Sequence, residues 1–150
     1  MKTLFETARV QEIKQRLAEL KPDSQRLWGK MDVAQALAHC TAAFDFATGR
    51  KVAPRIWLGR IVGSLAKRSV IHQQKPIPRN SQTAKEVLVT DQRVFEVERE
   101  RLYETIDSFA STGPSGCSLH PHFFFGKLKP EEWSSLMYQH LDHHLRQFGA

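Results

Sequence analysis

Apolar residues recur at steps of three and four positions along most of the chain, which is the spacing of one face of an α-helix. Near the amino terminus this spacing predicts a first helix from about Glu6 to Leu20, which Pro22 ends. A second helix is expected to start at Asp32, a favourable N-cap, and to stop before Gly49. Its inward stripe consists of Val33, Leu37, Cys40 and Phe44.

The middle of the chain predicts one short helix and one long helix. The short one lies within residues 54–71, where Gly59 and Gly63 weaken it, and its apolar residues are Trp57, Leu58, Ile61, Val62 and Leu65. The proline-containing segment 76–80 is expected to be extended. The long helix follows over about 91–109, with an inward face of Val94, Val97, Leu102, Ile106 and Phe109.

The last helix is expected to start at Pro130, since proline suits the first helical position, and to run almost to the carboxyl terminus. Residues 86–89 are the only strand candidate. The pattern therefore predicts an all-α fold, namely a four-helix bundle with a long crossover between helices 2 and 3 that carries a short extra helix. A length of 150 residues favours a single domain that spans residues 1–150.

The formal net charge of +6 is concentrated in one segment. Residues 46–85 contain nine Lys and Arg residues and no Asp or Glu, whereas the rest of the chain carries thirteen basic and sixteen acidic residues. We interpret the basic segment as a solvated face, because it lacks a recognition-helix motif and has too few aromatic residues for stacking on nucleic acid. A nucleic-acid partner is therefore not expected.

Targeting and redox signals are weak. No apolar run approaches the roughly 20 residues that span a bilayer, and the amino terminus lacks the apolar core of a signal peptide. The two cysteines, Cys40 and Cys117, form no Cys-x-x-Cys pair. We therefore expect a cytoplasmic protein without a membrane partner, and we interpret Cys40 as a small buried hydrophobe.

Two histidines lie on the inward face of the last predicted helix. His140 and His144 are four positions apart, so their rings stack one turn apart and can reach one ion. Burial of polar rings costs free energy unless they are hydrogen-bonded or bind something. Metal binding and structural hydrogen bonding therefore both remain open for this pair.

A metal site needs a third ligand from another helix. His39 on the second predicted helix is the best candidate, although on a helical wheel it flanks the inward stripe instead of lying at its centre. Gln35, one turn before His39, is a possible hydrogen-bond partner of the His39 ring. His143 lies at the edge of the inward stripe of the last helix and is a further candidate for the pocket around the metal. His120 and His122 lie in the loop before the last helix. Each of them either lines the mouth of the predicted metal pocket or is an ordinary loop histidine.

Two segments, LWGKMDVAQALAHC and HPHFFFGKLKPEEWSSLMYQHLDHHLRQFG, resemble a subgroup of unknown function in the DinB-like superfamily. The resemblance covers nearly the whole chain. It implies a four-helix bundle, often a homodimer, in which His39, His140 and His144 hold a divalent metal. The match also includes His120, Pro121, Gly126 and Trp133, but Lys129 stands where a capping Ser or Thr is expected.

Three neutral imidazoles leave a divalent ion its full charge, so such a site can support hydrolysis or thiol transfer on a small molecule. Zinc and nickel are favoured, with iron and copper as alternatives. The substrate is expected to be a thiol or an anion, drawn by basic side chains such as Arg55, Arg60 and Lys67. Asp142 lies on the opposite side of the helix, so no general base accompanies the histidines.

Two alternatives remain open. The protein is either a metal-dependent enzyme or a non-catalytic helical module, stabilised by the metal, that binds an anionic partner through the basic segment 46–85. A third interpretation is a metal-free interaction protein in which the histidines only hydrogen-bond to one another.

Overall fold

The computed structural model describes residues 1–81 and 83–150. These residues form no β-strand. The five α-helices are α1 (Thr7–Glu19), α2 (Val33–Ala47), α3 (Trp57–Lys67), α4 (Phe95–Thr112) and α5 (Pro130–Gln147). Three short helices complete the structure: the π-helix η1 (Arg68–His72) and the 3-10 helices η2 (Lys85–Val87) and η3 (Gly113–Gly116). The prediction of an all-α protein is confirmed, and the strand candidate at 86–89 is replaced by η2 and an extended residue.

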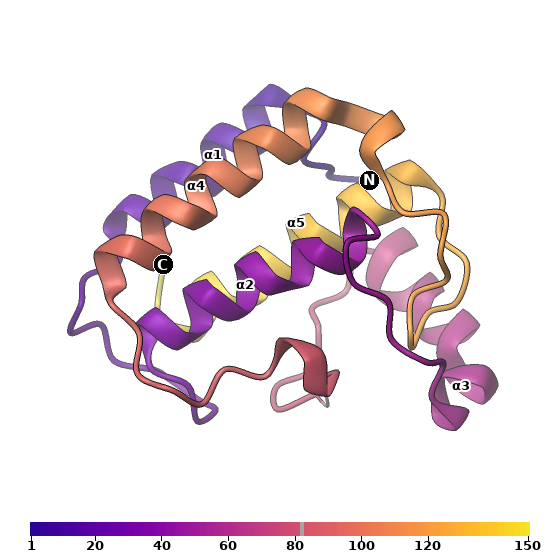
Figure 1. The fold of residues 1–150 in the computed structure, drawn as a ribbon, viewed down its shortest axis with the longest axis horizontal. Helices are drawn as coiled ribbons and strands as arrows, with labels where there is room; N and C mark the ends of the chain where they lie inside the picture. Colours follow the sequence, from indigo (N-terminus) through magenta and orange to yellow (C-terminus); the bar gives the residue numbers. More distant parts are fainter. Residues whose placement is uncertain (82) are drawn as a thin grey trace.

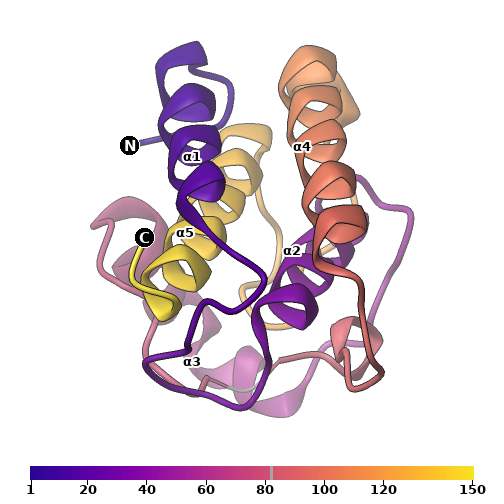
Figure 2. The same ribbon diagram turned by 90° about the vertical axis from the view of Figure 1, so that its left-hand side faces the viewer.

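The four long helices pack in two layers, α1 with α4 and α2 with α5 (Figures 1 and 2). Helix α2 contacts both α4 and α5, and α1 also contacts both. Helices α2 and α4 run in the same direction, because the long connection between them returns the chain to the same end (Figure 1). The largest fully buried side chains of this core include Ile13, Phe44, Leu102, Ile106 and Leu141.

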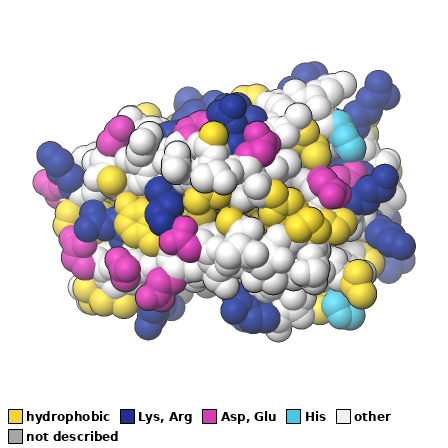
Figure 3. Space-filling model, turned by 90° about the horizontal axis from the view of Figure 1, so that it is seen from above, with side chains coloured by type: hydrophobic (Ala, Val, Ile, Leu, Met, Phe, Trp, Pro, Cys, Tyr) yellow, Lys and Arg dark blue, Asp and Glu magenta, His cyan; other side chains and the backbone are white. Residues whose placement is uncertain are grey.

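The face formed by α1 and α4 has a mixed charge. Seen from above, a band of hydrophobic side chains runs along the molecule, with Lys, Arg, Asp and Glu side chains on both sides of it (Figure 3). Lys14 of α1 and Asp107 of α4 form an ion pair between these helices, at 2.7 Å. None of the helices in the described part of the chain is long and apolar enough to cross a membrane.

Helix α2 starts where Asp32 and Gln35 cap each other. The carboxylate of Asp32 accepts a hydrogen bond from the Gln35 backbone N–H at 2.8 Å, and the Gln35 side-chain oxygen accepts one from the Asp32 backbone N–H at 3.0 Å. This reciprocal capping satisfies two N–H groups that a helix start would leave unpaired. The amide nitrogen of Gln35 also donates to the Asp91 carbonyl at 3.1 Å, which ties the connection between α2 and α4, here called the crossover, to the start of α2.

Helix α5 starts at Pro130, as predicted, without a hydroxyl cap. Lys129 occupies the N-cap position, and its backbone N–H donates to the Glu132 carboxylate at 2.8 Å. Glu132 is buried and also binds Lys67 at 3.1 Å and His72 at 2.9 Å. The end of α3 and the start of α5 are therefore held together by one buried carboxylate.

Helix α4 differs from the prediction at its start. It begins at Phe95, and Val94 and Val97, which were expected to point inward, are exposed. The buried face instead passes through Phe95, Glu98, Leu102, Ile106 and Phe109. This orientation of α4 buries the ring of Phe95 and leaves Val94 and Val97 in water. The free energy gained grows with the apolar area removed from water, so burial of the phenylalanine ring is favoured.

Helix α3 turns its apolar residues outward. Its stripe of Trp57, Leu58, Ile61, Val62 and Leu65 is exposed, while Gly59 and Gly63 are the buried residues. An added Cβ at Gly59 would lie 2.6 Å from the Phe124 carbonyl oxygen, and one at Gly63 would lie 2.3 Å from the same oxygen. The two glycines therefore form a smooth edge on which the loop before α5 packs, and the apolar residues face outward.

We predict that Gly63→Ala destabilises the protein by about 1–3 kcal/mol, because the new methyl group overlaps the Phe124 carbonyl. Intrinsic helix propensity alone predicts the opposite, a gain of about 1 kcal/mol. Chemical denaturation measures the difference. Ser64→Ala, at an exposed position of the same helix, is the control and should be neutral or slightly stabilising. Equal stability gains in both variants would contradict this packing of α3.

Candidate metal centre

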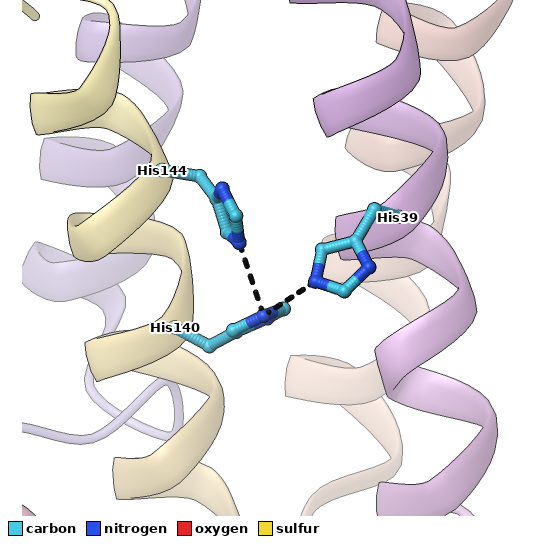
Figure 4. A group of neighbouring side chains, drawn as sticks. All are labelled: His39, His140 and His144. Carbon is cyan, nitrogen blue, oxygen red and sulfur yellow. Dashed lines mark hydrogen bonds between the residues drawn. The ribbon is translucent and has the colours of Figure 1, made fainter. Parts of the chain in front are cut away.

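Three imidazole rings meet between α2 and α5 (Figure 4). His39 comes from α2, and His140 and His144 come from successive turns of α5. The Nε2 atom of His140 lies 3.0 Å from Nε2 of His39 and 3.2 Å from Nε2 of His144. The three rings offer one nitrogen each within a span of 4.8 Å. The tertiary structure thus brings together the three histidines that the sequence singled out.

His39 is held from outside the four long helices. Its Nδ1 atom lies 2.8 Å from the carbonyl oxygen of Val87, which belongs to η2 in the crossover. The crossover therefore covers the flank of α2 that a helical wheel places beside the core, and His39 is only 3% exposed. A carbonyl oxygen only accepts hydrogen bonds, so the proton of the His39 ring is on Nδ1.

His144 is oriented by Gln147, one turn further along α5. The Nδ1 atom of His144 lies 2.8 Å from the side-chain oxygen of Gln147, whose amide nitrogen donates to the Trp28 carbonyl at 2.8 Å. Because the amide nitrogen is committed to Trp28, its oxygen faces the ring and Nδ1 of His144 carries the proton. Gly29 has a φ of 81°, and a Cβ there would meet the Gln147 amide at 2.5 Å, so glycine lets the loop approach.

The two outer hydrogen bonds decide what the inner nitrogens offer. With protons on Nδ1, both His39 and His144 present an unprotonated Nε2 to the same neighbour, Nε2 of His140. A single N–H on His140 cannot satisfy two acceptors with good geometry. The arrangement is therefore poorly suited to hydrogen bonding among the rings alone and well suited to a cation that accepts three lone pairs.

The surroundings keep these rings neutral. Burial lowers the pKa of all three, and for His144 the pKa falls to about 3. The neighbouring rings lower the pKa of His140 further, while the Val87 carbonyl partly offsets the effect of burial at His39. Neutral imidazole is the form that binds metals, so the site needs no proton release at neutral pH.

Two of the three distances between the ligand nitrogens match those around one ion, and all three nitrogens lie within 4.8 Å of one another. Ligands about 2.0–2.1 Å from a tetrahedral ion lie about 3.3 Å apart, close to the 3.0 and 3.2 Å between the His140 nitrogen and its two neighbours. Cys40 follows His39 but points into the core, and burial raises the pKa of its thiol. Among the described residues, the ligand group contains only the three histidines, so a fourth coordination position is left for another molecule.

The other residues predicted for the pocket, Gln35, His143 and His120, do not hydrogen-bond the three rings. The side chain of Gln35 is used in capping α2 and in binding Asp91, and its hydrogen bonds do not reach His39. His143 is buried and stands edge-on to Trp28, and burial lowers the pKa of its ring. His120 is exposed in its loop. Sequence reasoning missed Gln147, although its three-residue spacing from His144 was a usable signal.

His122 has a structural role in the loop before α5. Its Nδ1 accepts hydrogen bonds from the backbone N–H groups of Phe124 at 3.1 Å and Phe125 at 3.2 Å. Burial, with a smaller contribution from the charge of Arg55, lowers the pKa of His122 to about 3. The neutral ring therefore holds the loop on which α3 packs.

Three of the charged residues that the sequence analysis considered for the site are already paired. Asp142 binds Arg16 at 2.9 Å and Arg146 at 3.0 Å, so this carboxylate is not free to act as a general base. Lys67 binds Glu132, and Arg55 donates to the Gly59 carbonyl at 3.0 Å. Two of the basic side chains expected to attract an anionic substrate are thus engaged around α3.

A small apolar cavity lies on the core side of His144. Its volume is about 10 Å³, and it is lined mainly by leucines such as Leu17, Leu102 and Leu141. This volume accommodates one water molecule at most. The cavity is therefore too small to hold a substrate.

The low pKa of His122 predicts a loss of stability in acid. Because the folded-state pKa of about 3 lies below the usual value of about 6.5, His122 contributes its full stability above pH 6.5. As the pH falls from 6.5 toward 3, the unfolded chain takes up a proton that the folded chain refuses, which costs about 1.4 kcal/mol per pH unit. His122→Asn should reduce the slope of unfolding free energy against pH by that amount.

Denaturation in the presence of a chelator, at several values between pH 6.5 and 4, measures this slope. His120→Asn, two positions earlier and exposed, is the matched control and should keep the wild-type slope. An identical slope in His122→Asn and the wild type would refute the buried neutral role of His122.

Comparison with known proteins gives one match. No curated protein and no solved structure matches the chain. The family model described as "Protein of unknown function (DUF1569)" matches residues 4–150, and it is not a DinB-like model. The assignment to the DinB-like superfamily is therefore wrong, and the thiol transfer and homodimer inferred from it lose their support. With a match over nearly its full length, the chain belongs to the DUF1569 family.

Proposed function

We propose that the protein binds one divalent metal ion through the Nε2 atoms of His39, His140 and His144 and uses it to hydrolyse a small molecule. Zinc and nickel are the favoured ions, with iron and copper as alternatives. The proposal treats residues 1–150 as one domain, a four-helix bundle of α1, α2, α4 and α5 whose crossover carries α3. We also propose that the protein is located in the cytoplasm.

One observation carries the proposal: two unprotonated nitrogens face a third nitrogen at 3.0 and 3.2 Å, and their outer nitrogens are fixed by Val87 and Gln147. Ligands of this kind are oriented by hydrogen bonds on the second ring nitrogen, as in known metal sites. A site built only for structure would gain nothing from directing two acceptors at one neighbour.

The ligand number favours catalysis over a purely structural ion. Structural zinc sites have four protein ligands, whereas catalytic sites have three and keep one position open. An ion with three neutral ligands keeps its charge and supplies Lewis acidity and water activation. The chain's own residues orient the rings and exclude water from the core side through Leu141 and its neighbours. A non-catalytic, metal-stabilised module is the alternative.

We expect metal analysis of the untagged protein to find about one ion per chain. His140→Ala and His144→Ala should each lose it, since either change leaves two ligands. His120→Ala removes an exposed histidine outside the site and should retain the ion. A full complement of metal in both ligand variants would contradict the proposed site.

Catalysis is tested on the same proteins. Turnover of a panel of small esters and amides should disappear on chelation, return when the metal is restored and be absent in His140→Ala. Retention of the ion without turnover of any substrate in the panel would favour the non-catalytic module.

Gln147→Leu should weaken metal affinity about 10- to 100-fold, because the His144 ring loses the acceptor that fixes its tautomer. Competition with a chromogenic chelator measures the affinity. Gln139→Leu is the matched control, since Gln139 is buried on the same helix and, among the described residues, its side chain forms no hydrogen bond with His39, His140 or His144. Equal affinities of the two variants would show that Gln147 does not orient the site.

A further inference from the structure

The outward face of α3 is unusually apolar for a protein surface. Five large hydrophobic residues are exposed there, three of them by about 70%: Trp57 (72%), Ile61 (67%) and Leu65 (70%). Together with Leu58 and Val62, they recur at the spacing of a single helical stripe. A contiguous apolar stripe marks an interaction surface, whereas isolated exposed apolar residues do not.

The stripe stands on a projecting helix and not in a groove. Helix α3 lies at the right-hand end of the molecule in Figure 1, and among the described helices it contacts only η1. It is fixed by its glycine edge against Phe124 and by the hydrogen bond from the Ile56 N–H to the Phe123 carbonyl at 3.2 Å. This attachment keeps the apolar side chains on the convex outer side.

The charged residues of the segment that contains the stripe have one sign. Arg60 and Arg68 are exposed beside the stripe, and the surrounding segment 46–85 contains no Asp or Glu. The nearby carboxylate of Glu132 is buried and already binds Lys67 and His72. The partner should therefore supply both an apolar environment and negative charge.

We infer that α3 is an interfacial helix that docks the protein on an anionic phospholipid membrane. The apolar stripe enters the headgroup region, and Arg60 and Arg68 contact the lipid phosphates. Amphipathic helices with Trp, Leu and Ile on one face and basic residues beside it bind membranes in this way. The inference differs from the sequence-based expectation of no membrane partner, and it does not depend on the metal site.

A second copy of the chain fits this face less well. A two-fold contact through α3 would bring Arg60 and Arg68 of both copies together, because such an interface uses the same surface twice. The segment offers no acidic side chain to pair with them. An anionic lipid surface removes this repulsion, and basic residues near such a surface strengthen binding.

Sedimentation with vesicles tests the inference. The full-length protein should bind vesicles of equimolar phosphatidylglycerol and phosphatidylcholine in dilute buffer, and it should bind pure phosphatidylcholine at least about tenfold more weakly. Binding should fall steeply in about 1 M salt, where charges are screened within about 3 Å. Trp fluorescence should shift to the blue on binding, and the shift should be lost in Trp57→Phe.

The decisive comparison uses two double variants that remove equal numbers of exposed apolar side chains. Ile61→Gln/Leu65→Gln should lower the partition coefficient about tenfold or more, because its sites lie on the stripe. Leu27→Gln/Val94→Gln, at positions exposed by 67% and 65% elsewhere, should stay within about twofold of the wild type. Circular dichroism and metal content should be unchanged in both.

Three results would overturn the inference. The first is a failure of the wild type to bind anionic vesicles, and the second is equal loss of binding in the two double variants. The third is a wild-type dimer that Ile61→Gln/Leu65→Gln converts to a monomer in sedimentation velocity, which would assign the face to a second copy of the chain.

Discussion

Two hydrogen bonds on the outer nitrogens of His39 and His144 control the direction of the inner nitrogens. One acceptor is the Val87 carbonyl of the crossover, and the other is the side chain of Gln147 on α5. Since each ring carries a single proton when neutral, fixing that proton on the outside leaves a lone pair on the inside. The proposed metal site follows from this constraint and from the packing of α2 against α5.

The constraint also explains why the crossover follows its path. In the crossover, the Val87 carbonyl accepts a hydrogen bond from the His39 ring, and the backbone of Ile77 lies near the His143 ring. The crossover therefore closes the side of the histidine cluster that the four long helices leave open. Removal of polar rings from water is costly, and the Val87 acceptor offsets part of that cost.

The histidine cluster and α3 differ in what they bury. At the histidine cluster, polar groups are buried and paired with specific acceptors. At α3, apolar groups are left in water because the glycine edge, and not the apolar stripe, packs against Phe124. Burial of the stripe would be more favourable for the isolated chain. Its exposure is therefore best explained by a function that lies outside the chain.

Much of the local structure could be predicted from the sequence. Periodicity and capping residues located α1, α2 and α5 to within about a residue or two, and the four-residue spacing placed His140 and His144 on one side of α5. The wheel did not place His39 at the centre of the core, because a wheel does not include the crossover that covers it. The resemblance of two segments to DinB-like proteins led to the wrong family, although the three histidines it singled out do converge.

The sequence by itself determined the helical class, the boundaries of α1, α2 and α5 and the presence of an inward histidine pair, because these depend on neighbours within one or two turns. The tertiary structure alone decided that Val87 and Gln147 orient the rings, that Phe95 replaces Val94 in the core and that α3 turns its apolar stripe outward. Each of these depends on residues far apart in the chain. The surface that a helix buries is set by whatever packs against it, and periodicity carries no information about that partner.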